Sequence, residues 1–210
     1  METYPLHHSG STVHLALFTA IENAPALRQR LIHASTLPDD DNGTAERAAV
    51  DFAFVDAAMI TSRLHVLTAI HQALLARSQG TLKTKTLHSE VLWMLEPGTN
   101  ISDSLKHFGL SASTSSLLLV RIASSDPSAN SGTPGGDEVL RRMHEIVEGE
   151  LASLELLGRL PEGGTNEKSI RKTYKLNQDA IFSSLKQGSP EALQALDRLA
   201  TSTVALKSVM

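Results

Sequence analysis

Four short runs of apolar residues divide the first 122 residues of this chain into a repeating pattern. Each run is about five or six residues long and is followed by polar or turn-forming residues, as is typical of strands buried on both faces. The third run carries Trp93, the only tryptophan, and stops before Pro97 and Gly98. The pattern therefore predicts strands at residues 13–18, 52–56, 91–95 and 117–122.

Apolar residues at helical spacing fill the segments between these runs. A proline in the first turn and a preceding Asn23 predict a helix at residues 24–33. Thr61 or Ser62 can cap the longest predicted helix, at residues 62–77. The apolar stripe expected on that helix consists of Leu64, Leu67, Ile70 and Leu74.

A shorter helix is predicted at residues 101–108, directly after the third run. Asn100 can cap it, because its side-chain oxygen can accept the free N–H groups of the first turn. Gly109 is expected to end the helix in the left-handed conformation. The apolar face of this helix consists of Ile101, Leu105 and Phe108.

Two polar stretches interrupt the pattern. Residues 36–48 are acidic and predict a surface loop, and residues 123–136 are rich in Ser, Pro and Gly and predict a flexible linker. After the linker, Asp137 is expected to cap a helix that reaches residue 147, and the remaining pattern is mainly helical. The later helices are predicted at residues 167–176, 178–185 and 190–204.

Together these elements predict an α/β fold in a single domain, residues 1–210. A mixed sheet of about four strands is expected in the N-terminal part, where it packs with helices. The C-terminal part is expected to be mainly helical.

Composition narrows the classes of function. The chain has no cysteine, which excludes disulfides, thiolate zinc sites and cysteine nucleophiles. Its net charge of −4 argues against a globally basic nucleic-acid binder, although a local basic patch is compatible with it. With neither a secretory leader nor an apolar run of about 20 residues, we expect a soluble intracellular protein.

The search for catalytic chemistry returns weak signals. The nine histidines do not form the HExxH pattern, and His144 with Glu148, one helical turn apart, lacks a third metal ligand at matching spacing. The glycine-rich residues 132–136 lack the lysine of a phosphate loop, and no GxSxG motif is present. His88, Ser89 and Glu90 are adjacent, but alternate side chains of a strand face opposite ways. We therefore expect no enzyme activity, no cofactor and no bound metal.

The order of several segments resembles the PRPK-binding-protein family, the small non-catalytic subunits of the KEOPS (EKC) complex. The resemblance rests on HLALF, FAFVD, the helix ITSRLHVLTAIHQALLAR, KTKTLHSEVLWMLEPGTNISDSLKHFG, SSLLLVRI and the later IRKTYKL. It covers roughly residues 13–122 and 138–176, and the acidic stretch, the linker and the final helix depart from it.

The resemblance implies a non-catalytic protein that binds the small atypical kinase/ATPase of the complex and, through it, the remaining subunits. It also implies support for threonylcarbamoyladenosine formation at position 37 of tRNA, contact with the tRNA 3′ end and, in fungi, telomere maintenance. The expected location is the nucleus and cytoplasm, with no membrane partner. The alternative from the residues alone is a stand-alone α/β hydrolase or ligand-binding protein with a site of scattered residues.

Two surfaces are candidates for these contacts. A kinase-binding patch is predicted where the long helix and the helix near residue 170 come together, with ordinary core as the alternative. Its residues are Val66, Ala69, Ala73, Ile170, Tyr174 and Leu176. A basic tRNA-binding surface is predicted from two groups of cations, with simple solvation of loops as the alternative. Its residues are Arg77, Lys83, Lys85, His88, Lys106, Arg171, Lys172 and Lys175.

Overall fold

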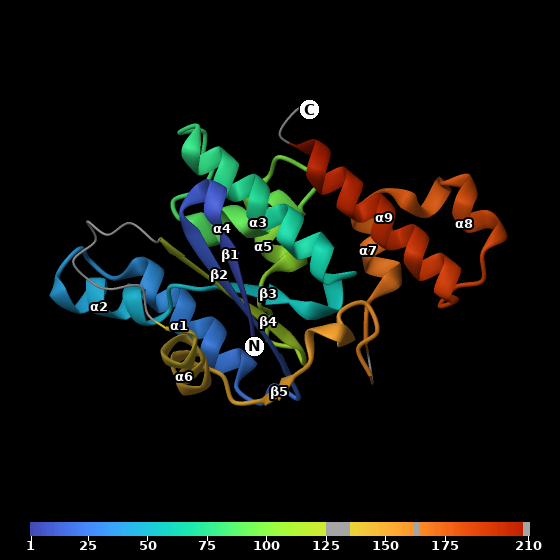
Figure 1. The fold of residues 1–210 in the computed structure, drawn as a ribbon. Coiled ribbons are helices and arrows are strands. Elements are labelled where there is room, and N and C mark those ends of the chain that lie inside the picture. The colour runs from blue at the N-terminus through green and yellow to red at the C-terminus, as the bar shows by residue number, and fades with distance from the viewer. Residues whose placement is uncertain (125–134, 162–163, 208–210) are drawn as a thin grey trace. The chain divides into compact units, whose positions relative to one another are not determined.

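The computed structural model describes residues 1–124, 135–161 and 164–207, so most of the expected linker at residues 123–136 lies outside the described residues (Figure 1). Contacts within the chain define two compact units. The first unit consists of Met1–Val55 and Leu110–Ser153. The second consists of Asp56–Gly109 and Leu154–Met210. Each unit is therefore assembled from two separate segments of the chain.

The first unit is organised around a sheet with the strand order β1-β2-β4-β3, in which β5 also pairs with β2 (Figure 1). The strands are β1 (Glu2–Leu6), β2 (Ser11–Thr19), β3 (Ala53–Asp56), β4 (Leu117–Ser124) and β5 (Glu150–Ala152). Strand β2 pairs antiparallel with β1, β4 and β5, with Leu15 opposite Val120 in β4. The predicted α/β class is confirmed, and antiparallel pairing predominates where a mixed sheet was expected.

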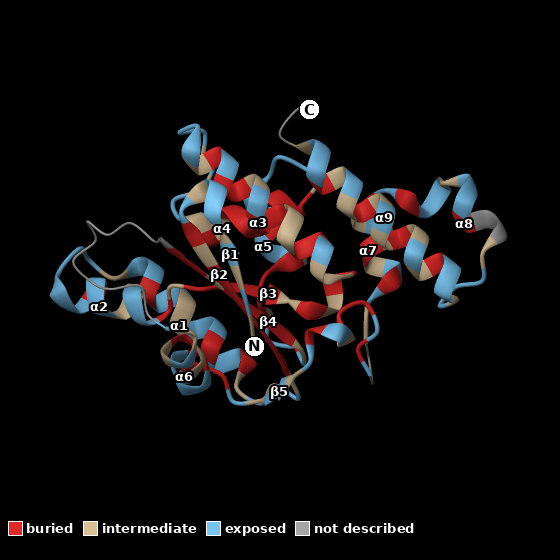
Figure 2. Cartoon of the chain, viewed as in Figure 1, coloured by how far each residue is buried: buried red, intermediate tan, exposed pale blue. Residues whose placement is uncertain are grey.

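Helices α1 (Ala24–Thr36), α2 (Asp41–Ala49) and α6 (Gly136–Ile146) and a short 3₁₀ turn, η1 (His7–Ser9), complete the first unit. Phe18 of β2, Leu119 of β4 and Met143 of α6 belong to one buried apolar cluster with side chains of α1 and β3 (Figure 2). Burying such side chains stabilises each of them by roughly 1.5–3 kcal/mol relative to exposure to water.

Three expectations for the first unit were wrong. The acidic stretch contains helix α2, because the Asp40 carboxylate accepts the Gly43 N–H at 2.7 Å and caps it. Asn23 does not cap α1 with its side chain; its amide instead donates to the Ile146 carbonyl at 3.0 Å. Helix α6 likewise begins without a side-chain cap, after Gly135 rather than Asp137. At Asn23 a long-range hydrogen bond thus replaces the local cap that the sequence pattern suggests.

The second unit is helical in all its longer elements. It contains α3 (Arg63–Ser78), α4 (Leu87–Leu95), α5 (Ile101–Phe108), α7 (Glu167–Thr173), α8 (Ala180–Ser184) and α9 (Pro190–Leu206), with the 3₁₀ turns η2 (Ala57–Met59), η3 (Leu154–Leu156) and η4 (Leu176–Gln178). Helix α3 packs against both α4 and α9. Lys207, just after α9, donates to the Gly98 carbonyl at 3.0 Å and to the Trp93 carbonyl, and its ammonium lies 3.5 Å from the centre of the Trp93 ring.

The apolar run at residues 91–95 is helical and forms the end of α4, so the predicted strand there was wrong. Thr86 starts this helix by accepting the Ser89 N–H at 3.1 Å. All five side chains of the run are buried, which removes the polar face that marks an ordinary surface helix. A short, fully buried helix and a buried strand present the same apolar run.

The inner face of α3 differs from the predicted stripe. Leu64 is 61% exposed, whereas Val66, Ala69 and Ala73 are fully buried alongside Ile70. Two alanines on the buried face allow neighbouring helices to approach closely. The buried face of α3 is therefore rotated by part of a helical turn from the predicted stripe. Apolar periodicity alone did not separate the two faces, because leucines lie on both.

Helix α5 follows the prediction, with the Asn100 side chain accepting the Ser102 N–H at 2.9 Å. Gly109, however, has φ −82° and is extended rather than left-handed. A Cβ at this position would lie 2.4 Å from the Leu105 carbonyl oxygen. The glycine is therefore explained by a close backbone approach rather than by its backbone angles.

Candidate functional site

All six residues predicted to bind a kinase lie inside the second unit. Val66, Ala69 and Ala73 of α3 are fully buried, and so is Ile170 of α7. Tyr174 and Leu176 are also buried. Their positions match the alternative interpretation, in which these side chains form ordinary core. A surface for a partner has to be sought among other residues.

Tyr174 is held by a buried hydrogen-bond chain. The Thr61 N–H donates to Nδ1 of His65 at 3.3 Å, so Nε2 carries the proton and donates to the Tyr174 hydroxyl at 2.7 Å. That hydroxyl donates in turn to the Leu95 carbonyl at 2.7 Å. Burial lowers the pKa of His65 to about 4 and raises the pKa of Tyr174, so both rings are neutral at physiological pH. The chain of bonds joins α3, α4 and the end of α7.

The cations of the predicted tRNA-binding surface fall into different environments. Lys83 and Lys85 are exposed on the loop between α3 and α4, whereas His88 is buried. Arg171 forms an ion pair with Glu167, and its guanidinium lies 4.0 Å from the centre of the Phe182 ring. The remaining members are the half-buried Arg77 and the exposed Lys106, Lys172 and Lys175. Of these cations, the two loop lysines, Lys83 and Lys85, line the same depression.

That depression, which we call the basic groove, has a volume of about 420 Å³. Ile101 and Leu105 of α5 line it and are 41% and 50% exposed. The complete lining is Lys83, Thr84, Lys85, Ser89, Ile101, Ser104 and Leu105. Two ammonium groups, three hydroxyl groups and two aliphatic side chains thus face one depression with no carboxylate in its lining.

Local sequence signals fix both ends of the loop that carries the lysines. Gly80 adopts φ +66°, a conformation that other residues adopt at a cost, and the Thr81 N–H donates to the Ala76 carbonyl at 2.9 Å. At the other end Thr86 caps α4. The loop therefore joins two helices at defined points, and its lysines face the N-terminal end of α5.

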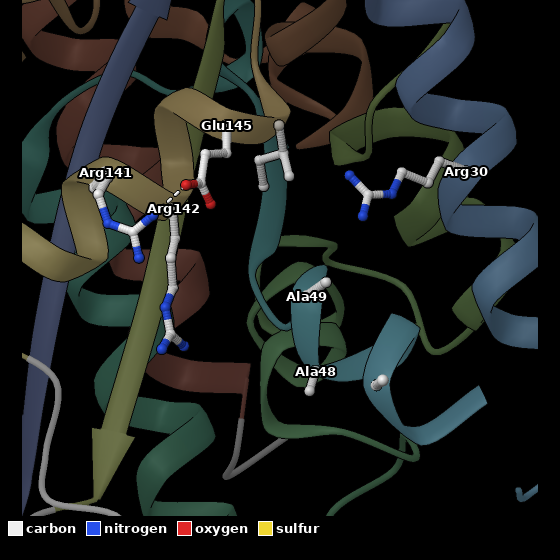
Figure 3. A pocket seen from close by; sticks show the side chains of 8 residues that line it. Arg30, Ala48, Ala49, Arg141, Arg142 and Glu145 are labelled. Carbon is white, nitrogen blue, oxygen red and sulfur yellow. Dashed lines mark hydrogen bonds and ion pairs between the residues drawn. The ribbon is translucent and has the colours of Figure 1, made fainter. Parts of the chain in front are cut away.

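A second depression of about 420 Å³ lies in the first unit, among α1, α2 and α6 (Figure 3). We call it the arginine depression; its lining is Arg30, Ala45, Ala48, Ala49, Arg141, Arg142, Glu145 and Ile146. No sequence prediction pointed to it. The spacing of Glu138, Arg141, Arg142 and Glu145 on one helix was a usable signal, because side chains three and four residues apart are neighbours.

Every arginine of this depression has an acidic partner. Arg30 donates to both oxygens of Glu46, at 2.6 and 3.2 Å. Arg141 and Arg142 both donate to Glu138 at 2.8 Å, and Arg141 also pairs with Glu145 (Figure 3). Hydrogen bonds from Arg142 and Arg141 lower the pKa of Glu138, which keeps it ionised. The positive charge here is matched by neighbouring carboxylates.

The described residues provide no further chemistry of the kinds sought. His88, Ser89 and Glu90 lie on α4, where consecutive side chains diverge around the helix, so they do not form a triad. Among the described residues, no group of three His, Asp or Glu side chains could hold a metal ion. Within the same residues, no helix is long and apolar enough to cross a membrane.

Comparison with known proteins gives consistent matches over most of the chain. Residues 18–208 match the family described as kinase binding protein CGI-121. The EKC/KEOPS complex subunit cgi121 of Aspergillus fumigatus is 32% identical over 180 residues, which cover 84% of each chain. The subunit of the same name from Cryptococcus neoformans is 31% identical over 233 residues, covering 95% of this chain and 94% of the relative. That from Candida albicans is 31% identical over 79% of each chain.

Proposed function

The chain belongs to the kinase binding protein CGI-121 family, and on that basis we propose that it is a non-catalytic KEOPS subunit that binds the small atypical kinase/ATPase of the complex. Through that kinase it supports threonylcarbamoyladenosine formation at position 37 of tRNA. Roles at telomeres and in both nucleus and cytoplasm belong to the same proposal and rest on the family resemblance alone.

The basic groove is the observation that best supports a contact with the tRNA 3′ end. A single-stranded nucleic-acid end offers phosphates to cations and unstacked bases to apolar side chains. Lys83 and Lys85 supply the cations, and the exposed Ile101 and Leu105 supply apolar surface beside them. Among the described residues, neither lysine has an ion-pair partner, so both ammonium groups are available to phosphate. We therefore assign the 3′ end to this groove.

The test measures tRNA binding against salt, for intact tRNA and for tRNA that lacks its terminal nucleotides. Two or three neutralised phosphates give a slope of log affinity against log salt of about −1.5 to −2. Trimming the 3′ end should weaken binding to the wild-type chain and reduce this slope. If trimming changes neither, the groove does not hold the 3′ end.

The kinase contact is proposed for the exposed sides of α3 and α9, which pack against each other. Leu64 on α3 and Leu206 on α9 are the two most exposed large apolar side chains of the described residues, at 61% and 54%. Exposed apolar side chains mark an interaction surface when they belong to one patch, so we place the contact along the exposed sides of both helices, from Leu64 to Leu206. This surface replaces the six buried residues named from the sequence.

Co-elution with the kinase tests this surface. Leu64→Asp should leave the fold intact and remove the kinase from the eluted complex. Ile32→Asp on α1 is the matched control, since Ile32 is 49% exposed but lies in the first unit. Ile170→Glu should unfold the second unit, because it places a carboxylate at a fully buried position. Retention of the kinase by Leu64→Asp would refute this surface.

A further inference from the structure

Glu90 is a fully buried carboxylate beneath the loop that carries Lys83 and Lys85. Its relative exposure is 0%. One oxygen, Oε2, lies 3.0 Å from the Lys83 N–H, 2.8 Å from the Thr84 N–H and 2.7 Å from the Thr84 hydroxyl. The other, Oε1, accepts the Lys83 N–H at 3.1 Å. Two consecutive residues of the loop thus converge on one carboxylate.

A buried carboxylate is costly unless hydrogen bonds or a cation compensate for lost hydration. Among the described residues, Glu90 accepts hydrogen bonds from backbone N–H groups and one hydroxyl, and no cationic side chain forms a salt bridge with it. The charge of Glu90 is therefore compensated by hydrogen bonds from the loop, with the Lys207 ammonium interacting with it at longer range. The lysine side chains are left free of it and remain exposed.

This arrangement joins the loop to a rigid element. Glu90 lies in the first turn of α4, whose own start is capped by Thr86, and α4 packs against α3. The same helix contributes Ser89 to the lining of the basic groove. The backbone positions of Lys83 and Thr84 are thus fixed relative to one wall of the groove.

We propose that Glu90 is the positioning residue of the basic groove: it holds the loop in the conformation that presents Lys83 and Lys85 to a single-stranded RNA end. The inference rests on the proposed function of that groove. Glu90 itself touches no RNA. It acts by ordering the loop before binding, so that less conformational entropy is lost when the lysines meet phosphate.

The sign of a substitution effect separates this role from a purely electrostatic one. Loss of a negative charge close to a phosphate-binding groove strengthens RNA binding when charge alone matters. Loss of the oxygens that order the loop weakens RNA binding. Glu90→Leu removes both the charge and the acceptors, whereas Glu90→Gln removes the charge but keeps one acceptor oxygen for the Oε2 position.

The experiment measures binding of a short single-stranded RNA with the sequence of a tRNA 3′ end to the full-length chain. We expect Glu90→Leu to bind about tenfold more weakly, in line with the cost of ordering two long side chains on binding. Glu90→Gln should remain within about threefold of the wild type, because the three contacts at Oε2 can be kept. Both variants strengthening binding equally would overturn the inference.

A second readout follows the loop without RNA. Trypsin cleaves after lysine, so ordering of the loop protects the bonds after Lys83 and Lys85. Glu90→Leu should accelerate cleavage at these two sites and leave cleavage after the exposed Lys172 unchanged. Cleavage at equal rates in the wild type and Glu90→Leu would overturn the inference, whatever the RNA result.

Controls separate this inference from the proposed function. If Lys83→Ala with Lys85→Ala leaves RNA binding unchanged, the groove is not the RNA site and the proposed function fails there; the trypsin rates then decide whether Glu90 positions the loop. Should Glu90→Leu fail to fold, Thr84→Val replaces it, with Thr84→Ser as its conservative partner. Thr84→Val must then show faster cleavage than Thr84→Ser, and equal rates would overturn the inference.

Discussion

The basic groove and the arginine depression have the same volume, about 420 Å³, but their cations differ in whether carboxylates neutralise them. Three arginines face the arginine depression, yet each donates to a glutamate. Only two lysines face the basic groove, and the nearby acid, Glu90, is bonded to the backbone instead. The comparison teaches that a group of cations indicates an anion-binding site only when neighbouring carboxylates do not already pair with it.

The two types of cation explain part of this difference. A guanidinium has a planar fork of donors that matches a carboxylate, so arginines near glutamates on one helix pair readily. An ammonium on a flexible stem forms such pairs less specifically and stays hydrated. Exposed pairs contribute little stability, so the main effect of pairing in the arginine depression is to cancel charge.

The largest expected effect is that of acid on the stability of the second unit, which carries the basic groove. His65 has a folded pKa of about 4 against an ordinary 6.5, so the unfolded chain binds a proton that the folded chain does not. The contribution of His65 to the free energy of unfolding is therefore fully present above pH 6.5. It is lost as the pH drops toward 4, by roughly 3 kcal/mol at most. Urea unfolding at pH 7 and pH 4.5 measures this loss.

The variant His65→Asn isolates the contribution of this ring, because it cannot take up the proton. Its unfolding free energy should be lower than that of the wild type at pH 7 and less dependent on pH between 6.5 and 4. In the arginine depression, hydrogen bonds from Arg142 and Arg141 lower the pKa of Glu138, so this carboxylate resists protonation better than a free glutamate does. Equal pH dependence in both proteins would contradict the assigned role of His65.

Charge reversal tests the comparison directly. Lys83→Glu with Lys85→Glu should weaken tRNA binding at least tenfold at low salt and remove most of the salt slope, because each neutralised phosphate contributes about −0.7 to that slope. Arg141→Glu with Arg142→Glu reverses the same number of charges in the arginine depression and should leave binding nearly unchanged. A filter-binding titration of both double variants decides the matter; equal losses would make the effect nonspecific.

The apolar part of the basic groove gives a smaller effect of a different kind. Leu105→Ser should weaken binding about fivefold without altering the salt slope, because it removes apolar contact with a base and no charge. Leu151→Ser is the control, as Leu151 is 41% exposed and lies in the first unit. A changed slope in Leu105→Ser would show that the substitution disturbs the lysines.

The smallest expected effect comes from a substitution that frees arginines of the arginine depression from a carboxylate, as the lysines of the basic groove are free. Glu138→Gln releases Arg141 and Arg142 from their shared carboxylate. We expect RNA binding at low salt to rise two- to threefold, with a slope steeper by about 0.7 for one additional phosphate. An unchanged slope would show that pairing with Glu138 is not what prevents these arginines from binding RNA.

Much of the first unit could be predicted, because its central strands are continuous apolar runs such as Leu117–Val120. Strand β1 escaped prediction, since ETYPL begins with two polar residues and contains a proline suited to an edge. The apolar run that ends α4 was ambiguous for a physical reason: burial on all sides removes both the helical and the strand period.

The basic groove could be predicted only in part. Lys83 and Lys85 stood out from the sequence, because no acid lies near them before Glu90. That Ile101 and Leu105 are exposed could not be predicted, since an amphipathic helix looks the same whether its apolar face meets a core or lines a groove. The burial of Glu90 was equally invisible, because it depends on the backbone of a loop.

The interleaving of the two units sets an order for biosynthesis. Residues 56–109 of the second unit are made before residues 154–207, and the second segment of the first unit lies between them. Helix α4 therefore leaves the ribosome without Tyr174, α9 or the ammonium of Lys207, which later meets the Gly98 carbonyl. Until then its apolar side chains lack their partners, and the incomplete second unit is most prone to aggregation in this interval.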